Sequence, residues 1–296
     1  MIELRSGRLR AVVLPAVGGG LARLDWLGGP ARAEPLPVLR PVPDGVEQPL
    51  PGQLACFPLV PWSNRIAPDG FEFEGRRITP APTREGEPCP IHGDGWHLPW
   101  HVEACDESSV VLSLCRSDGA PFAFTANMAY TLSDHALRVT LKVTNNGPHP
   151  LPFGLGLHPW MPCPEDAQLR AAADGVWLSG ADKLPATRSA LPQAWDFGGA
   201  APRPLPRDGV DNAFTGWDGS AQIDWPSRRL RLGIRADMAY YILYAPPGKD
   251  FFCFEPVDHP INAHNLPGGA AANGLTVLAP GQDLRRTVRL AVEEIA

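Results

Sequence analysis

Apolar and polar residues alternate along much of this chain, with the period of two that is typical of β-strands. The alternation is unbroken over Leu137–Thr144, which predicts a strand with one buried face, and Asn145–Pro148 then supplies turn-forming residues. A looser alternation over Leu284–Leu290 predicts a second strand near the C-terminus. The segment Phe71–Ile78 is expected to form a hairpin that turns near Gly75.

Further strands are predicted at six places, and no long helix is evident between them. They cover Leu9–Leu14, Val110–Leu114, Phe122–Leu132, Gln222–Trp225, Leu230–Ile234 and Tyr240–Tyr244. The 35 prolines and 30 glycines are spread between the apolar runs without a repeat period, and such dispersed breakers divide a chain into short strands and turns.

Two stretches, Pro35–Pro51 and Leu184–Pro206, lack periodicity and are expected to be long surface connections. Strand patterns of the same kind continue on both sides of them. Residues 1–296 are therefore expected to form one domain, an all-β antiparallel sandwich.

Composition and charge narrow the range of functions. The net charge is −6 and no long basic run is present, so nucleic acid and anionic membrane surfaces are not expected as partners. No apolar run approaches the ~20 residues of a membrane span, and residues 1–6 lack the plan of a signal peptide. The six cysteines follow no regular spacing, and Cys115 and Cys253 lie in apolar runs that favour burial. A cytoplasmic protein with reduced thiols, a monomer or a homodimer, is the simplest interpretation.

Glu255 directly follows four apolar residues, 251–254. A carboxylate in such surroundings is expected to lose part of its hydration, which raises its pKa toward the range useful for a general base. Pro256 is expected to end the strand and so to place Glu255 at a strand end, where a pocket can open. The alternative is a Glu255 that points to solvent from an edge strand.

His158 lies in a second apolar run, after Gly154 and Gly156 and before Pro159. The two glycines leave room on one face of the run for a ligand or another backbone. They are not a dinucleotide-binding motif, because the third glycine and the following helix are missing. A His and a Glu in such runs are a candidate acid/base pair, and the alternative for His158 is an ordinary core histidine.

No metal site is expected from the sequence. Neither a helical His-x-x-x-His pattern nor a zinc-finger pattern connects the remaining histidines and the nearby acid, which are His92, His97, His101, Asp258, His259 and His264.

Two further segments carry side chains suited to a sugar. Arg65 follows Asn64 and offers a rigid fork of donors for two oxygens of one ligand, unless it is a surface residue at a turn. Asp211 lies three residues before Phe214, so that a carboxylate for paired hydroxyls would lie near an aromatic face, unless it belongs to an Asx turn. Aromatic faces suit the C–H side of a pyranose, and four tryptophans lie within or beside the segments described above: Trp62, Trp96, Trp160 and Trp217.

Taken together and in this order, the segments resemble the aldose 1-epimerase (galactose mutarotase) family. The matching motifs are Asn64-Arg65-Ile66, His92-Gly93 with Trp100, His158-Pro159, Asp211 with Phe214, and Glu255-Pro256. The resemblance extends from about Leu54 to Pro280. It implies a large antiparallel β-sandwich of the galactose mutarotase-like supersandwich type, an open sugar cleft, a monosaccharide substrate and no cofactor.

The resemblance also implies an activity and residue roles. The activity is interconversion of the α and β anomers of a free aldose by acid/base ring opening and reclosure. Glu255 would be the general base on the anomeric hydroxyl and His158 the general acid at the ring oxygen, with His92 near the reacting centre. The residues implied to bind the substrate are Asn64, Arg65, Asp211, Trp160 and Phe214.

Two departures indicate a divergent bacterial-type subgroup. Val60-Pro61 stands where many members have Gly-Arg, and Trp160 stands where many have Tyr. Neither change affects the proton-transfer residues. Both affect the shape of the pocket, so a preference for galactose or glucose does not follow.

Three other functions remain open at this point. A hexose-phosphate 1-epimerase would need a cluster of Arg or Lys for the phosphate, and only Arg65 and Lys249 lie near the motifs. A glycoside hydrolase could use Glu255 and Asp211 as its two carboxylates, but this leaves His158 without a role. A non-catalytic sugar-binding module of the same fold needs neither Glu255 nor His158.

Overall fold

Two large antiparallel β-sheets, packed face to face, form the body of the protein. The computed structural model describes residues 1–28, 34–118 and 121–295. The larger sheet runs, strand by strand, through β1 (Ile2–Ser6), β2 (Leu9–Leu14), β3 (Gly20–Trp26), β5 (Cys56–Leu59), β13 (Gly156–Pro162), β22 (Phe251–Val257), β21 (Tyr240–Ala245), β18 (Val210–Thr215), β15 (Gly175–Ser179) and β16 (Pro185–Ser189), with β4 (Leu36–Pro37) beside β3.

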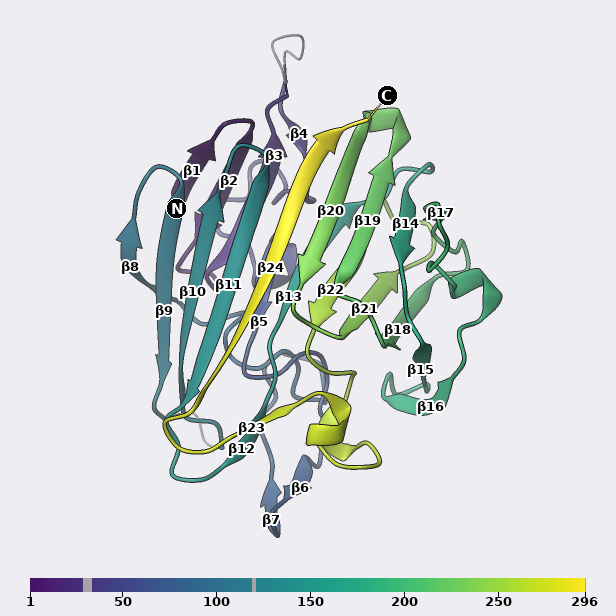
Figure 1. The fold of residues 1–296 in the computed structure, drawn as a ribbon. Coiled ribbons are helices and arrows are strands. Elements are labelled where there is room, and N and C mark those ends of the chain that lie inside the picture. Colours follow the sequence, from purple (N-terminus) through teal and green to yellow (C-terminus); the bar gives the residue numbers. More distant parts are fainter. Residues whose placement is uncertain (29–33, 119–120, 296) are drawn as a thin grey trace.

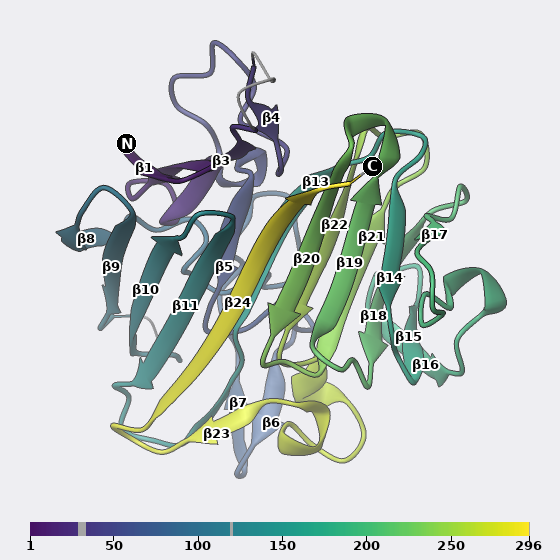
Figure 2. The ribbon, with the colours of Figure 1, turned by 45° about the horizontal axis from the view of Figure 1, so that its top comes forward.

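The second sheet lies in front of the larger one in Figures 1 and 2. It runs through β17 (Arg203–Pro204), β14 (Gln168–Ala171), β19 (Ser220–Trp225), β20 (Leu230–Ala236), β24 (Asp283–Glu294), β11 (Ala136–Asn145), β10 (Phe124–Leu132), β9 (Ser109–Arg116) and β8 (His101–Cys105). Two small ribbons complete the strands: β6 (Phe71–Phe73) with β7 (Arg76–Ile78), and β12 (Leu151–Phe153) with β23 (Thr276–Leu278). The helical segments of the described residues are single 3₁₀ turns: η1 (Pro51–Gln53), η2 (Gln193–Trp195), η3 (Pro226–Arg228), η4 (Ala263–Asn265) and η5 (Ala271–Asn273). This confirms the all-β antiparallel fold class.

The strands with clear alternation lie where the sequence predicts them. The hairpin β6–β7 turns through Glu74 and Gly75, both in the left-handed region. The predicted surface connections were partly wrong, because β4 lies in the first and both β16 and β17 lie in the second. β16 is an edge strand whose residues are all exposed or half-buried, so it has no apolar face to produce the alternating pattern.

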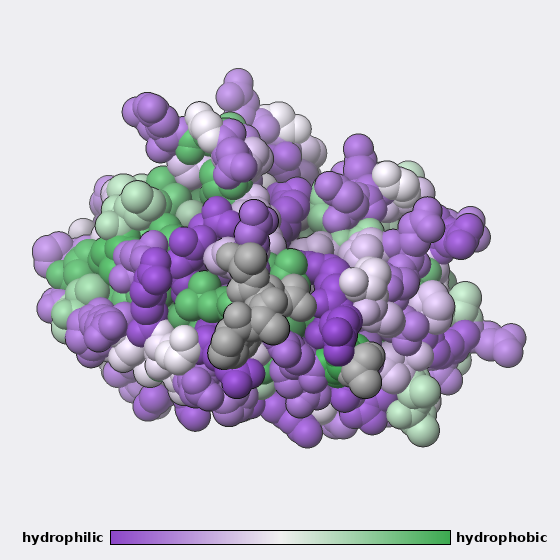
Figure 3. All heavy atoms as spheres, turned by 90° about the horizontal axis from the view of Figure 1, so that it is seen from above, coloured by the Kyte–Doolittle hydropathy of each residue, from purple (hydrophilic) through white to green (hydrophobic). Residues whose placement is uncertain are grey.

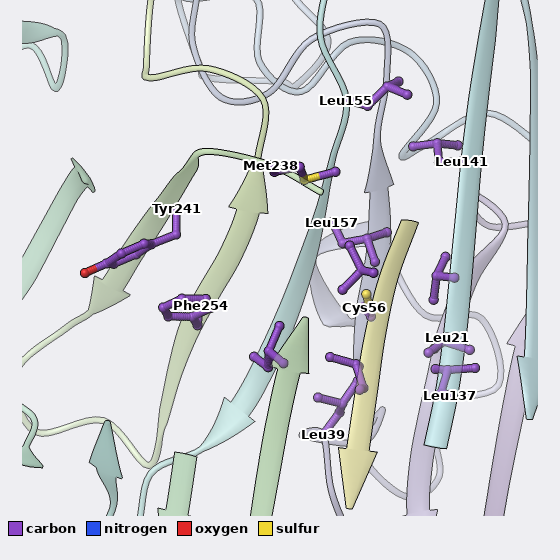
Figure 4. Close-up of a cluster of buried hydrophobic side chains, with 14 of the residues drawn as sticks. Leu21, Leu39, Cys56, Leu137, Leu141, Leu155, Leu157, Met238, Tyr241 and Phe254 are labelled. Atoms are coloured by element: carbon purple, nitrogen blue, oxygen red, sulfur yellow. The ribbon is translucent and has the colours of Figure 1, made fainter. Parts of the chain in front are cut away.

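The main core fills the space between the two sheets. Leu137 and Leu141 on β11 lie across from Leu21, Cys56 and Leu157 of the larger sheet (Figure 4). Burial of this apolar surface is the main force that holds the sheets together.

The larger sheet also has a second buried face, turned away from that core. Side chains of a strand alternate between faces, so Phe57, His158 and Glu255 point to the opposite side from Cys56 and Leu157. Loop residues, among them Ile91, Trp96 and Ile261, pack on this outer face. The apolar residues buried there are Leu54, Phe57, Leu59, Ile91, Trp96, Ala213, Ile242, Val257 and Ile261. We call this surface the site face.

Figure 3 shows hydrophilic residues over much of the face seen from above, with smaller apolar areas between them. No helix in residues 1–28, 34–118 and 121–295 is both long and apolar enough to cross a membrane. All six cysteines are free. Cys253 is buried as predicted, but Cys115 is exposed, because it lies on the solvent side of β9, where alternate residues face outward.

Candidate acid/base site

The register of two neighbouring strands brings His158 and Glu255 together on the site face. β13 and β22 run antiparallel, with Trp160 opposite Cys253. His158 lies two residues before Trp160 and Glu255 two residues after Cys253, so the two side chains face one another. His158 Nε2 lies 3.3 Å from Glu255 Oε1, and the exposed fractions of the two side chains are 9% and 2%.

The ladder between these two strands is interrupted at the site. Gly156 pairs with Val257 and Trp160 pairs with Cys253, but the residues between them, Leu157–Pro159 on β13 and Phe254–Pro256 on β22, are not paired with each other. Pro159 and Pro256, one on each strand, have no N–H to donate to a ladder. The prediction that Pro256 ends the strand was wrong, since Pro256 pairs with Tyr241 on the other side and β22 continues to Val257. The edge-strand alternative for Glu255 is also wrong, because β22 is a central strand.

A loop brings His92 against the same pair. The Asn64 N–H donates to His92 Nδ1 at 3.1 Å, and the His92 N–H donates to the Asn64 carbonyl at 3.0 Å. This leaves Nε2 to carry the proton of the neutral His92 ring. Both residues have positive φ, 55° for Asn64 and 62° for His92. Gly93 follows with φ of 67°, and a Cβ there would lie 2.3 Å from the Val60 carbonyl oxygen, so only glycine fits.

Aromatic rings enclose the two histidines. Phe57 stacks on His158 with ring centres 4.4 Å apart, and Trp160 stacks at 5.3 Å. The His92 ring meets the His158 ring edge-on, with 5.2 Å between centres. Arg40 covers the Trp160 ring with its guanidinium 4.0 Å from the ring centre, which builds a rigid wall on this side.

Burial controls the charges of the acid/base pair. Desolvation raises the pKa of Glu255 well above its usual value; Asp211 adds to the rise and Arg65 opposes it. Desolvation lowers the pKa of His158 to about 3 and that of His92 well below its usual value. The raised pKa of Glu255 favours the protonated carboxyl, and the lowered pKa of His158 favours the neutral ring. Glu255 and His158 are therefore suited to share one proton across the 3.3 Å contact. Glu255 Oε2 and His158 Nδ1 have no hydrogen-bond partner among the described residues.

Arg65 lies beside this site but is held by an acid. Its Nη2 and Nε donate to Glu87 Oε2 at 2.8 and 3.2 Å. Burial acts to raise the pKa of Glu87, but the hydrogen bonds and charge of Arg65 outweigh it and lower that pKa. Most of the positive charge of Arg65 is therefore already balanced.

Asp211 occupies the next cross-strand row of the site face. It is opposite Tyr244, which is opposite Cys253, which is opposite Trp160. Asp211 and Tyr244 line a hollow of about 410 Å³, together with Lys183. Burial raises the pKa of Asp211, and Arg65 and Lys183 oppose the rise. The carboxylate is thus placed near the acid/base pair, with open space beside it.

Phe214 does not belong to this site, which corrects the prediction from sequence. It lies three residues after Asp211, so it points to the opposite face of β18. There it is fully buried and stacks on Tyr241 with ring centres 4.6 Å apart. Trp62 and Trp217 also pack in the core between the sheets, whereas Trp96 and Trp160 lie at the site.

The glycines before His158 make room for neighbouring groups of the protein. A Cβ on Gly154 would lie 2.2 Å from the ring of His259, and one on Gly156 would lie 2.9 Å from the Pro256 carbonyl oxygen. Gly156 thus makes room for another backbone, which is the second of the two explanations that the sequence left open, whereas Gly154 makes room for a side chain.

Several site residues had no signal in the sequence. They are Phe57, Arg40, Glu87 and Tyr244, which come from segments without a recognisable motif. Strand register places Phe57 and Tyr244, and side-chain contacts place the loop residues Arg40 and Glu87. Cys253 is different, since its position two residues before Glu255 on one strand already places both side chains on the same face.

Comparison with known proteins identifies the family of this chain. The family model described as Aldose 1-epimerase matches residues 1–291. This chain belongs to the aldose 1-epimerase family. It is 34% identical to the uncharacterized protein YphB of Escherichia coli K12 over 267 residues, which cover 87% of this chain and 89% of YphB.

Solved structures of similar proteins share the fold. A crystal structure from Escherichia coli K12, provisionally named an aldose 1-epimerase, has a TM-score of 0.89 and 31% identity, and the match covers 99% of this chain and 98% of that one. Galactose 1-epimerase from Lactobacillus acidophilus NCFM has a TM-score of 0.76 and 17% identity, with 99% and 93% covered. This aldose 1-epimerase family member therefore has the galactose mutarotase-like fold.

Proposed function

We propose that this protein interconverts the α and β anomers of a free aldose by acid/base catalysis. The observation that supports the proposal most is the contact between Glu255 and His158, 3.3 Å apart and buried on the site face, with His92 against them. Mutarotation needs one group that accepts a proton and one that donates a proton, and these side chains meet that need without a covalent intermediate.

In the proposed reaction Glu255 accepts the proton of the C1 hydroxyl while His158 donates a proton to the ring oxygen. The bond between C1 and the ring oxygen breaks, and C1 becomes the carbonyl carbon of the open-chain aldehyde. Rotation about C1–C2 presents the other face of the carbonyl, and the reverse transfers close the ring. Because Glu255 and His158 are in contact, the proton that they share can pass from the Glu255 carboxyl to the His158 imidazole, which sets up the carboxylate base and the protonated acid for the first step. The reverse transfers that close the ring return the pair to this state.

His158 is preferred to His92 as the acid. His158 contacts Glu255 directly, whereas His92 Nδ1 is held by the Asn64 N–H and its ring is fixed as a donor at Nε2. His92 therefore suits binding and orientation. Replacing His158 with Asn is expected to lower kcat more than replacing His92 with Asn, whose effect should appear more in KM. A larger loss of kcat for His92→Asn would move the acid role to His92.

The charge balance around Arg65 favours a neutral sugar over a sugar phosphate. Arg65 is paired with Glu87, and Lys183 acts on the carboxylates Glu87 and Asp211, so the positive charges of Arg65 and Lys183 are largely balanced. Arg84 also acts on His92. Glycoside hydrolysis gives no role to His158, and a non-catalytic module would gain nothing from a buried pair with shifted pKa values.

An anomer-exchange screen tests the proposal. The purified, chelator-treated protein should accelerate α–β exchange of at least one common aldose, measured by NMR magnetisation exchange or polarimetry. Hexose 6-phosphates form a second arm of the screen, and activity confined to that arm would replace the free aldose by a phosphorylated one. The absence of exchange in both arms, with sugar binding retained, would favour a binding module.

A further inference from the structure

The acid/base pair has a third neighbour that the proposed reaction does not use. Cys253 and Glu255 are two residues apart on β22, and their side chains lie on the same face, next to His158 of β13. One ligand atom from each of His158, Cys253 and Glu255 lies within 4.8 Å of the other two. This is the only such group of three or more His, Cys, Asp or Glu side chains in the described parts of the chain.

We propose that His158, Cys253 and Glu255 form an inhibitory binding site for zinc or a similar thiophilic divalent cation. Zinc bonds of about 2.0–2.1 Å to nitrogen and 2.0–2.2 Å to oxygen give tetrahedral edges of roughly 3.3 Å between those ligand atoms. The observed separation of His158 Nε2 and Glu255 Oε1 is 3.3 Å, which already matches such an edge. The thiol completes a set of one nitrogen, one sulfur and one oxygen, in which a thiolate and an imidazole favour zinc over magnesium or calcium.

Charge also favours a divalent cation here. All three residues are buried, with exposed fractions of the whole residue of 7% for His158, 0% for Cys253 and 2% for Glu255. A bound Zn²⁺ with one thiolate, one carboxylate and one neutral imidazole has no net charge, and burial strongly disfavours net charge. Glu255 Oε2 has no hydrogen-bond partner within the described residues, so the carboxylate can turn toward the metal without losing a hydrogen bond at that oxygen.

Metal binding here would stop proton transfer. The cation would take the lone pair of His158 Nε2 and a carboxylate oxygen of Glu255, the two groups assigned to the proton transfers. A bound aldose uses the same groups and should compete with the metal. Inhibition therefore rests on the proposed function, whereas metal binding does not.

Cobalt spectroscopy tests the binding step without an activity assay. The reduced, metal-free protein titrated with Co²⁺ should develop thiolate-to-cobalt charge transfer in the near ultraviolet and the strong visible bands of a tetrahedral site. Cys253→Ala should abolish the charge transfer and weaken Zn²⁺ binding in competition with Co²⁺ by about 10–100-fold or more, the loss typical of disturbing a ligand's surroundings alone. Cys56→Ala is the matched control, since Cys56 is also buried but faces the core between the sheets.

A second variant keeps the test valid if Cys253→Ala does not fold. Glu255→Gln, checked by circular dichroism, should keep the thiolate-to-cobalt band but bind Co²⁺ and Zn²⁺ more weakly. Unchanged metal affinity in both variants, or a wild-type protein without the charge-transfer band, would overturn the site.

Activity measurements then separate this proposal from the proposed function. Zn²⁺ should inhibit anomer exchange competitively with the aldose, and Cys253→Ala should resist the inhibition while Cys56→Ala does not. A Cys253-dependent cobalt spectrum in a protein without anomer exchange would uphold the metal site and reject the epimerase. Anomer exchange that Zn²⁺ at saturating concentration leaves unchanged would overturn the inhibitory role.

Discussion

The site face and the second sheet differ in the continuity of their hydrogen-bond ladders and in the polarity of their buried side chains, although both are built from antiparallel strands. The ladders of β11 with β10 and with β24 are continuous over nine residue pairs each. Buried and less buried side chains alternate along these strands, with the buried ones apolar almost throughout. At the site face, the β13–β22 ladder is interrupted, and His92, His158 and Glu255 are buried with shifted pKa values.

The contrast assigns stability to one region and reactivity to the other. Continuous ladders and apolar burial stabilise the sandwich, whereas buried polar groups without full hydrogen bonding cost stability and persist where chemistry requires them. Substitutions in the second sheet should therefore change stability alone, and substitutions at the site face should change activity first.

The largest effect is expected from Glu255→Gln. The amide keeps the shape of the side chain but cannot accept the C1 proton, so kcat should fall by about 10²–10⁴-fold. The free energy of unfolding should not fall, because a buried ionisable group is replaced by a neutral one. Anomer-exchange kinetics and urea denaturation measure the two quantities.

Glu293→Gln is the control for that variant. Glu293 is an exposed partner of Arg231 on the second sheet and should leave kcat unchanged. A Glu255→Gln variant with near-normal kcat would remove Glu255 from the mechanism.

Leu290→Ala tests the stabilising region. Leu290 is buried on β24 in the core between the sheets, and its truncation should lower the free energy of unfolding by about 2–5 kcal/mol. In the folded fraction kcat and KM should stay normal, since the site face lies on the far side of the other sheet. A changed kcat, measured well below the melting temperature, would mean that the two regions are coupled.

Acid should lower the free energy of unfolding through the buried histidine His259. Burial lowers the pKa of His259 to about 4, and its Nε2 accepts a hydrogen bond from the Ser63 N–H. The unfolded chain binds a proton near pH 6.5 and the folded chain only near pH 4, so stability falls as pH decreases through this window. The contribution of His259 is about 3 kcal/mol between these two pH values.

Urea denaturation from pH 7 to pH 4 measures this effect by comparison with His259→Gln. The fall in the free energy of unfolding should be smaller in the variant by about the stated amount. Equal falls in both proteins would show that His259 is not responsible.

The smallest effect is expected from the wall of the site. Arg40→Met removes the cation–π contact to Trp160 while keeping much of the side-chain bulk, and a contact of this kind contributes about 1 kcal/mol. KM for the aldose should rise roughly fivefold, with kcat little changed. The matched control is Arg8→Met, which removes a similar contact to Trp26 away from the site. An equal rise in KM in both variants would show that Arg40 does not contribute to the sugar site.

The sequence by itself determined the strands that have one buried and one exposed face. The long alternating run in β11 was predicted because burial on one side leaves a period of two in the sequence. Strands exposed on both sides, such as β16, leave no such period and were predicted as loop. The order of motifs also led to the prediction that His92, His158 and Glu255 share one site, and the structure brings these three side chains together.

Only the tertiary structure decided which side chains meet. The partners of Glu255 come from strands and loops up to two hundred residues away, and they depend on register, which no local pattern encodes. For this reason Phe214 was assigned to the wrong face of β18, and Pro256 was expected to end a strand that continues. For the same reason Cys253, a small buried residue by its sequence, is found beside the acid/base pair, because β13 and β22 place it within reach of His158.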